Sequence, residues 1–190
     1  MIAVRKAGII LATTLLVASA AFAQVKQQGS VSALKGHNTN APVDVQADRI
    51  EVQDRADRAV FSGNVHAVQA EMTLDTPRLT VAYSNGPGGG NTQIQRLDAA
   101  GGVTVKSPSE TAKGDFGIYD LNRKLITLIG NVQLNQRQNQ VNGARLVLDL
   151  DSGRAVVDGG PPGVNSSGGR VTGHFIVPQR QSQQPQQQKQ

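Results

Sequence analysis

Three arginines at equivalent positions of a repeated sequence are the side chains best suited to bind an anion. Arg49, Arg78 and Arg145 each stand before a similar apolar run, so they can stack in one column of a repetitive fold. A guanidinium group makes paired, charge-assisted hydrogen bonds with phosphate, and such a column could contact phosphate groups. The alternative, which we favour, is that they are solvated outer-face residues paired with neighbours such as Asp48.

The sequence contains no recognisable catalytic or metal-binding motif. The three histidines, His37, His66 and His174, are far apart in the sequence, and there is no cysteine. The glycine-rich stretch 86–90 is not followed by the Lys-Ser/Thr pair of a phosphate-binding loop. A general acid or base must lie within hydrogen-bond reach of the group on which it acts. We therefore expect no enzyme activity, no cofactor and no metal; an exported parallel β-helix enzyme acting on carbohydrates is the alternative.

A repeat of about 29 residues must position these side chains. Its marker glycines are Gly63, Gly101, Gly130 and Gly159. They are separated by 38, 29 and 29 residues, and one loop insertion at 85–91 explains the longer step. Repeats of this size indicate stacked supersecondary units, none of which buries its apolar face alone. We expect the units to form a single domain at 42–177.

Within the repeats, apolar and polar residues alternate with a period of two, as in half-buried β-strands. Leu79 and Val81, for example, alternate with Thr80. The pairs Gly63-Asn64, Gly101-Gly102, Gly130-Asn131 and Gly159-Gly160 tolerate positive φ, so we expect turns there between strands of about five to eight residues. The length of the domain fits about ten to sixteen strands, and the fold class is therefore all-β.

The two ends of the chain differ from the repeats. Residues 1–23 combine two basic residues, an apolar run and the sequence Ala21-Phe22-Ala23, a pattern typical of a secretory signal peptide cut before Gln24. A retained anchor is the alternative, but the run is shorter than the roughly 20 residues that a spanning helix needs. Residues 24–41 read as a flexible leader, and 178–190 as a disordered, Gln-rich tail.

The formal charge of +5 comes from the ends of the chain and not from the repeats. Between residues 42 and 176, 13 basic residues face 14 acidic ones. A nucleic-acid-binding domain concentrates basic charge on its folded surface, so we expect no nucleic-acid partner. Aromatic residues make up only 3% of the chain, and Val, Leu and Ile must therefore form the interior.

The order of three segments indicates a known family. QADRIEV at 46–52, AVFSGNV at 59–65 and LTVAY at 79–83 resemble the OstA-like (LptA) family of periplasmic lipopolysaccharide-transport proteins. The resemblance covers roughly residues 43–177. It implies an elongated, slightly twisted open β-jellyroll of two antiparallel sheets that enclose an apolar groove.

The same resemblance implies a function. Such proteins bind lipopolysaccharide in the periplasm and bridge the inner and outer membranes during outer-membrane assembly. Related modules occur in an inner-membrane component with an N-terminal anchor and in an outer-membrane component with a large barrel. The chain has neither feature, so we expect it to be the soluble bridge.

In such a fold the inner-face aliphatic residues would shield acyl chains, because each buried CH₂ is worth about 0.8 kcal/mol. The same residues could instead pack an ordinary core. The groove-lining candidates, chosen by alternation, are Val65, Leu74, Leu79, Val81, Val103, Val105, Ile118, Leu128, Val132, Leu134, Leu146 and Leu148. The arginine column would then be a candidate contact for head-group phosphates.

The terminal strands are the candidate contacts for protein partners. An open sheet leaves an unpaired edge at each end, to which a further strand can add through main-chain hydrogen bonds. We expect segments 43–52 and 171–177 to join transport components of similar fold, or a second copy head to tail. An exported structural or adhesive β-repeat protein without lipid affinity is the alternative function.

Overall fold

The computed structural model describes residues 37–86, 90–160 and 169–177. These residues form ten β-strands and one short 3₁₀ helix, and the predicted all-β, antiparallel fold class is confirmed. The predicted signal peptide, most of the predicted leader and the predicted Gln-rich tail lie outside the described residues.

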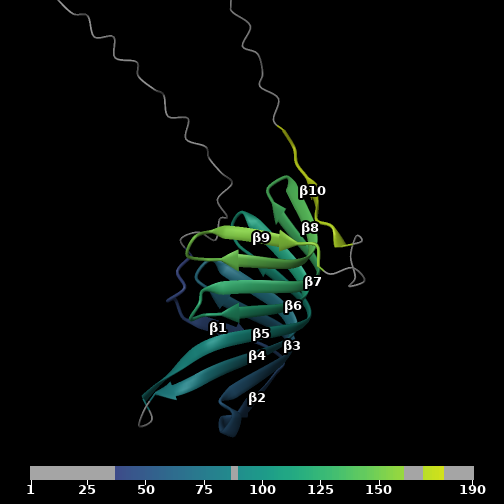
Figure 1. The fold of residues 1–190 in the computed structure, drawn as a ribbon. Coiled ribbons are helices and arrows are strands. Elements are labelled where there is room, and N and C mark those ends of the chain that lie inside the picture. The colour runs from purple at the N-terminus through teal and green to yellow at the C-terminus, as the bar shows by residue number, and fades with distance from the viewer. Residues whose placement is uncertain (1–36, 87–89, 161–168, 178–190) are drawn as a thin grey trace, which may run out of the picture.

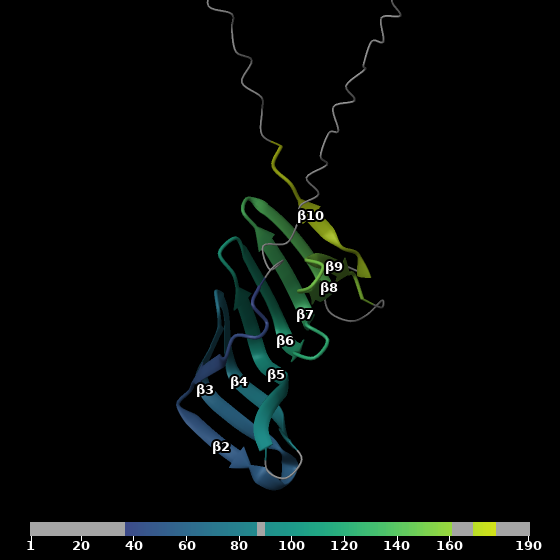
Figure 2. The ribbon, with the colours of Figure 1, turned by 90° about the vertical axis from the view of Figure 1, so that its left-hand side faces the viewer.

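All ten strands belong to one antiparallel sheet with the order β1-β3-β4-β5-β6-β7-β8-β10. β2 also pairs with β3, and β9 with β8, so each end of the sheet carries two short strands. Figures 1 and 2 show the strands stacked along the molecule, from β2 at one end to β10 at the other. The elements are β1 (Val43–Gln46), β2 (Arg49–Gln53), η1 (Asp54–Ala56), β3 (Arg58–Gln69), β4 (Met72–Gly86), β5 (Gly90–Lys106), β6 (Glu110–Asp120), β7 (Leu125–Gln136), β8 (Asn139–Asp149), β9 (Arg154–Asp158) and β10 (Thr172–His174).

Every pairing among the six long strands, β3 to β8, shifts register near the repeat glycines, and the β4–β5 pairing has two further shifts. Between Ser62 and Val65 of β3, the two residues Gly63 and Asn64 face the single residue Pro77 of β4. Such a β-bulge inserts an extra residue into one strand and bends it. Proline is tolerated at this point because a bulge interrupts the ladder of backbone hydrogen bonds. The repeat of the sequence is therefore a repeat of bent hairpins.

The turns predicted at Gly63-Asn64, Gly101-Gly102 and Gly130-Asn131 are therefore wrong, because these pairs lie inside long strands. The predicted strand length is also too short for β3 to β8, which contain 11 to 17 residues. The residues do adopt the expected positive φ, 80° at Gly130 and 44° at Asn131. Left-handed residues occur both in tight turns and in bulges, and the local sequence does not separate the two.

A carboxylate supports each Gly-Asn bulge: Asp48, between β1 and β2, and Asp115, in β6. Asn64 Nδ2 donates to Asp48 Oδ2, and Asn131 Nδ2 donates to Asp115 Oδ2, both at 2.8 Å. A Cβ on the glycine of either bulge would collide with the same carboxylate. Both the positive φ and this close approach require glycine.

The bends divide the sheet into two legs whose buried residues form one hydrophobic cluster. Leg A contains β1, β10 and residues 65–69, 72–76, 103–106, 110–114, 132–136 and 139–143. Leg B contains β2, β9 and residues 58–62, 78–82, 96–100, 116–120, 125–129 and 145–149. We call the side opposite the bends, where the legs end, the mouth. The two implied sheets are thus two halves of one continuous sheet.

The described part of the insertion lengthens β4 and β5. Pairing continues through Tyr83–Ile94 to Gly86–Gly90, beyond the last rung that β6 joins at Arg96. In Figure 1 this hairpin projects beyond the neighbouring strands. The inserted residues therefore extend two strands of leg B and leave the stacking order unchanged.

Replacing Gly130 by Ala should destabilise the protein by about 2 kcal/mol or more. A left-handed conformation costs a residue with a Cβ roughly 1–2 kcal/mol, and the added methyl group would also meet Asp115. Gly102→Ala is the control, since its φ is 96° but nothing lies within 4 Å of its Cβ position. Urea-induced unfolding followed by circular dichroism compares the two. Equal losses in both variants would contradict the proposed collision.

Candidate functional site

The strand registers arrange the side chains of leg B in transverse rows, with one residue from each strand. Two of these rows face leg A, and their largest members, including Leu79, Leu128 and Leu146, are completely or almost completely buried. The first row is Ile50, Phe61, Leu79, Ala99, Gly117, Leu128, Leu146 and Val157; the second is Val52, Ala59, Val81, Leu97, Tyr119, Ile126, Leu148 and Ala155. They form a nearly continuous apolar wall along the stack.

Leg A presents a matching wall. Its inner row is Val45, Ala67, Leu74, Val105, Ala112, Leu134 and Val141. Next to the bends, Val65, Val103 and Val132 are each about 2% exposed. The interior between the legs is therefore mainly aliphatic, as the composition predicted.

Eleven of the twelve predicted lining residues lie in these inner walls. Ile118 lies in a neighbouring row instead, although it is half-buried and borders a narrow cavity between the legs. It is in register with Asp98 and Thr127, in a row that faces outward. The bend after Gly114 shifts the alternation of β6 by one residue, so that Tyr119 points inward and is 3% exposed.

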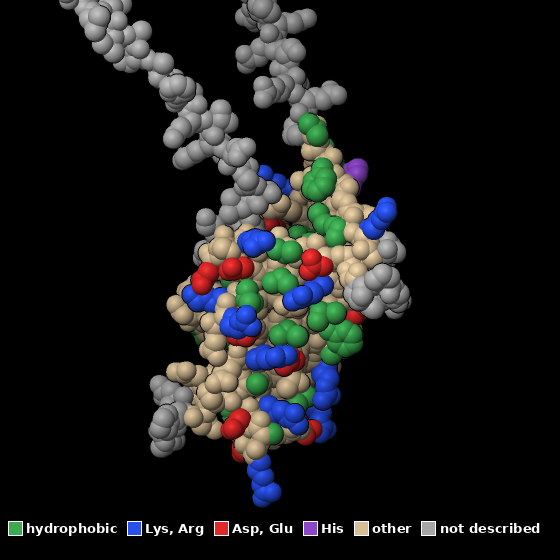
Figure 3. All heavy atoms as spheres, in the orientation of Figure 1, with side chains coloured by type: hydrophobic (Ala, Val, Ile, Leu, Met, Phe, Trp, Pro, Cys, Tyr) green, Lys and Arg blue, Asp and Glu red, His purple; other side chains and the backbone are tan. Residues whose placement is uncertain are grey.

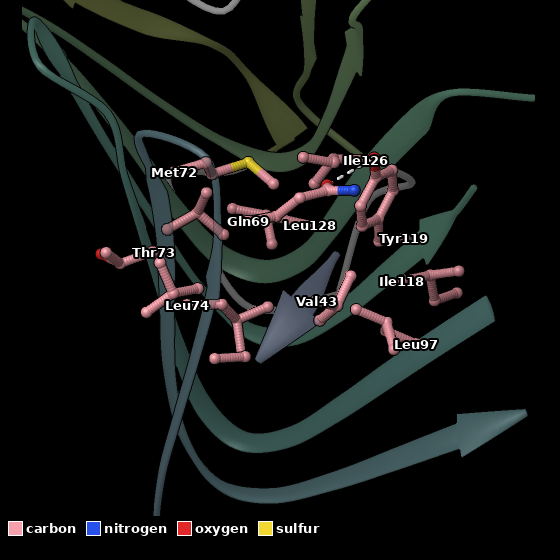
Figure 4. Close-up of a pocket in the computed structure, with 14 residues that line it drawn as sticks. Val43, Gln69, Met72, Thr73, Leu74, Leu97, Ile118, Tyr119, Ile126 and Leu128 are labelled. Carbon is pink, nitrogen blue, oxygen red and sulfur yellow. Dashed lines mark hydrogen bonds between the residues drawn. The ribbon is translucent and has the colours of Figure 1, made fainter. Parts of the chain in front are cut away.

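The interior is tightly packed around Leu79 and Leu128, both of which are completely buried. Figure 4 shows residues of both legs meeting around a cavity lined by Leu74, Leu97, Leu128 and others. Only about 20 Å³ of free space is left there, which is about enough for one water molecule. A long apolar ligand could enter only if it replaced contacts between leg A and leg B.

The C-terminal end of the interior is more open. A cavity of about 450 Å³ lies there against Leu134, Val141, Val157 and Phe175. The Phe175 side chain is 64% exposed, so this end is only partly covered. The cavity also touches polar residues, among them Gln136. It therefore combines an apolar floor with a polar rim.

The three arginines occupy one transverse row on the outer face of leg B, beside the bends. The row is Arg49, Ser62, Arg78, Ala100, Phe116, Ile129, Arg145 and Asp158. Asp48, the expected partner, accepts a hydrogen bond from Asn64, and Arg49 lies 3.7 Å from Glu51 instead. The arginines point away from the apolar interior, and this position supports the solvated alternative.

Opposite charges are interspersed on the outer surface, as Figure 3 shows. Arg96 lies 2.7 Å from Asp98, whose hydrogen bond is the main reason that the pKa of Arg96 is raised. Hydrogen bonds from His66 and then Lys106 lower the pKa of Asp75. The charged side chains therefore lie on a solvated outer face, and the apolar surface is internal.

The described residues form an apolar interior with charged side chains outside it. Among them, no group of three or more His, Cys, Asp or Glu side chains could hold a metal ion. In the same part of the chain, no helix is long and apolar enough to cross a membrane.

Comparison with known proteins identifies the family. A family model described as "LptA/(LptD N-terminal domain) LPS transport protein" matches residues 44–154, more than half of the chain. The chain belongs to this LptA/LptD N-terminal family. The family consists of lipopolysaccharide-transport proteins and not of enzymes, which agrees with the prediction made from the sequence.

Two further comparisons give a similar sequence and a similar fold. "Uncharacterized protein R00383" of Rhizobium meliloti (strain 1021) is 34% identical over 160 residues, which cover 82% of this chain and 81% of the relative. The crystal structure of LptH, the LptA-homologous periplasmic component of the lipopolysaccharide transport device of Pseudomonas aeruginosa, matches with a TM-score of 0.63. That match is 19% identical and covers 74% of this chain and 99% of LptH, so it supports the fold.

Sequence reasoning missed two polar residues of this LptA-family interior, Gln69 and Tyr119. Both are 3% exposed, and their side chains are joined by a hydrogen bond of 3.0 Å (Figure 4). They are 50 residues apart in the chain, and no local pattern links them. Counting the alternation of β6 from Gly117, after the bend, would have placed Tyr119 inside.

Burial raises the pKa of Tyr119 to about 12. Because this folded-state value lies above the ordinary 10.0, its contribution to stability is complete below about pH 10 and is lost as the pH rises toward 12. The chain has two tyrosines, so Tyr83→Phe leaves Tyr119 as the single reporter. Phenolate absorbance of that variant should titrate near 12 when folded and near 10 in denaturant. A folded-state midpoint near 10 would contradict the burial of Tyr119.

Proposed function

We propose that the chain is a periplasmic bridge that binds lipopolysaccharide and carries it from the inner to the outer membrane. The acyl chains would lie between leg A and leg B. The observation that carries this proposal is the pair of facing aliphatic walls that continue through the stack, in a chain of the LptA family. The signal-peptide pattern at 1–23 supports export to the periplasm.

The energetics suit reversible transport. Each acyl CH₂ that leaves water gains about 0.8 kcal/mol, and the inner walls are already buried against one another before lipid arrives. Lipid therefore exchanges apolar leg-to-leg contacts for apolar lipid contacts. In such an exchange no single CH₂ group is held at one fixed position. This suits a ligand that must move along the walls.

The length of the walls indicates how a bridge could be built. Eight strands in sequence, spaced by roughly 4.8 Å, give a stack of about 34 Å. A longer aqueous path would need several modules joined end to end. Strand addition at the edges keeps the walls of neighbouring modules in line.

Both edges are suitable for strand addition. β1 and β2 form one edge, and β9 and β10 form the other. Ile50 and Val52, which begin the two inner rows of leg B, are 54% and 58% exposed. We propose that transport components of similar fold, or a second copy, cover them.

The arginine row is a weaker candidate for contact with head-group phosphates. Arg78 and Arg145 are exposed and could bind an anion, but they lie beside the bends, on the outside of leg B. A head group attached to acyl chains in the interior would emerge at the mouth instead.

Photo-crosslinking separates this function from that of a structural or adhesive β-repeat protein. Benzoylphenylalanine at Leu134, which lines the open cavity, should label lipopolysaccharide. The same probe at Gln133, the adjacent outward-facing position, should label it weakly or not at all. An absence of labelling at Leu134, under conditions in which a known lipid carrier is labelled, would remove the transport proposal and favour the structural alternative.

A further inference from the structure

A buried polar cluster joins the two legs at the mouth. Gln69 ends β3 in leg A, and Tyr119 lies near the end of β6 in leg B. The Tyr119 hydroxyl donates to Gln69 Oε1 at 3.0 Å, and Figure 4 shows this bond between the two strands. This side-chain hydrogen bond spans the mouth from leg A to leg B, and it is separate from the backbone hydrogen bonds that pair the strands.

The segment before β1 completes the cluster. His37, which is 6% exposed, places Nε2 3.1 Å from Gln69 Oε1. Gln69 Nε2 donates to the carbonyl oxygens of Thr39 and Ala41, both at 3.0 Å. The amide of Gln69 thus uses both of its donors and two acceptor sites. A side chain held by four bonds has one orientation, and that orientation presents Oε1 to Tyr119.

The surroundings of the cluster are apolar. Met72, Leu97 and Ile126 line the narrow cavity beside it. A polar group buried among such residues is costly unless it is hydrogen-bonded, so separation of the legs requires water to reach these atoms. Water can replace each lost bond at the mouth, where solvent is close. The contact is therefore strong enough to favour closure and weak enough to open.

We propose that His37, Gln69 and Tyr119 form a mouth latch that gates entry of acyl chains into the interior. In the closed state the latch holds leg A to leg B, and little free space remains between them. When the Gln69–Tyr119 bond breaks, the legs separate at the mouth and the aliphatic walls become accessible from the side. The lipid part of this inference rests on the proposed function, whereas the latch itself does not.

Removal of one hydroxyl group tests the latch with little change of shape. Tyr119→Phe deletes the bond to Gln69, and Tyr83→Phe is the matched control, since its hydroxyl bonds only to exposed Asp54 at 3.4 Å. Lipopolysaccharide should bind Tyr119→Phe about threefold to tenfold faster than the unaltered protein, as expected from the loss of one net hydrogen bond. Tyr83→Phe should bind at the unaltered rate.

The opening can be measured without lipid. The chain contains no cysteine, so Pro108→Cys and Asn122→Cys place unique spin labels in exposed turns at the two ends of β6, one on each leg. Pulsed electron paramagnetic resonance should show a single short distance in the latched protein. Tyr119→Phe should add a population at longer distance, and Tyr83→Phe should not.

The outcomes separate the latch from the transport function. Unchanged distances and unchanged binding in a folded Tyr119→Phe protein would overturn the latch. A longer distance without lipopolysaccharide binding in any variant would support the latch and reject the proposed function. If Tyr119→Phe does not fold, Glu71→Ala gives a milder test, since Glu71 only supports His37 from the outside, at 3.2 Å. It should shift the distances in the same direction by a smaller amount, and no shift would overturn the latch.

Discussion

The fold depends on a backbone constraint, the left-handed residue pair at the centre of the bent strands. At Gly130 and Asn131 the chain takes positive φ, and Asp115 fills the space that a Cβ on Gly130 would need. Because equivalent pairs recur in β3, β5 and β7, every hairpin bends at the same place. One sheet can then fold over itself and bury an apolar face that a flat sheet would leave in water.

The apolar interior follows from this bend. Aligned bends bring inner-row residues such as Leu79 and Leu128 from every strand into two facing walls, with charged residues outside. None of the described strands closes the stack, so β2 and β10 lie at its two ends. The mouth is the one long side where the legs separate without breaking strand pairs, and the Gln69–Tyr119 bond lies there. Many backbone hydrogen bonds hold the strands together, whereas few side-chain bonds hold the legs together at the mouth. This difference would suit the proposed entry and release of a long lipid.

Much of this could be predicted from the sequence, because the period of two and the repeat of about 29 residues are local signals. Leu146 and Leu148 were placed inside correctly for that reason. Two features could not be predicted. A Gly-Asn pair has the same φ requirement in a turn as in a bulge, so the sequence predicts turns where the strands in fact bend. The inward position of Tyr119 depends on the shift of alternation at the bend, and its bond to Gln69 depends on the folded legs.

The central claim is that acyl chains occupy the space between the two legs. Methyl-labelled Leu and Val residues allow this to be tested by nuclear magnetic resonance with lipopolysaccharide. Nuclear Overhauser effects should connect acyl methylene protons to the inner-row methyl groups of Leu128 and Leu146, and none should reach Val147, which faces outward between them. Contacts to Val147, or unchanged signals from Leu128 and Leu146 with saturating lipopolysaccharide, would contradict the account.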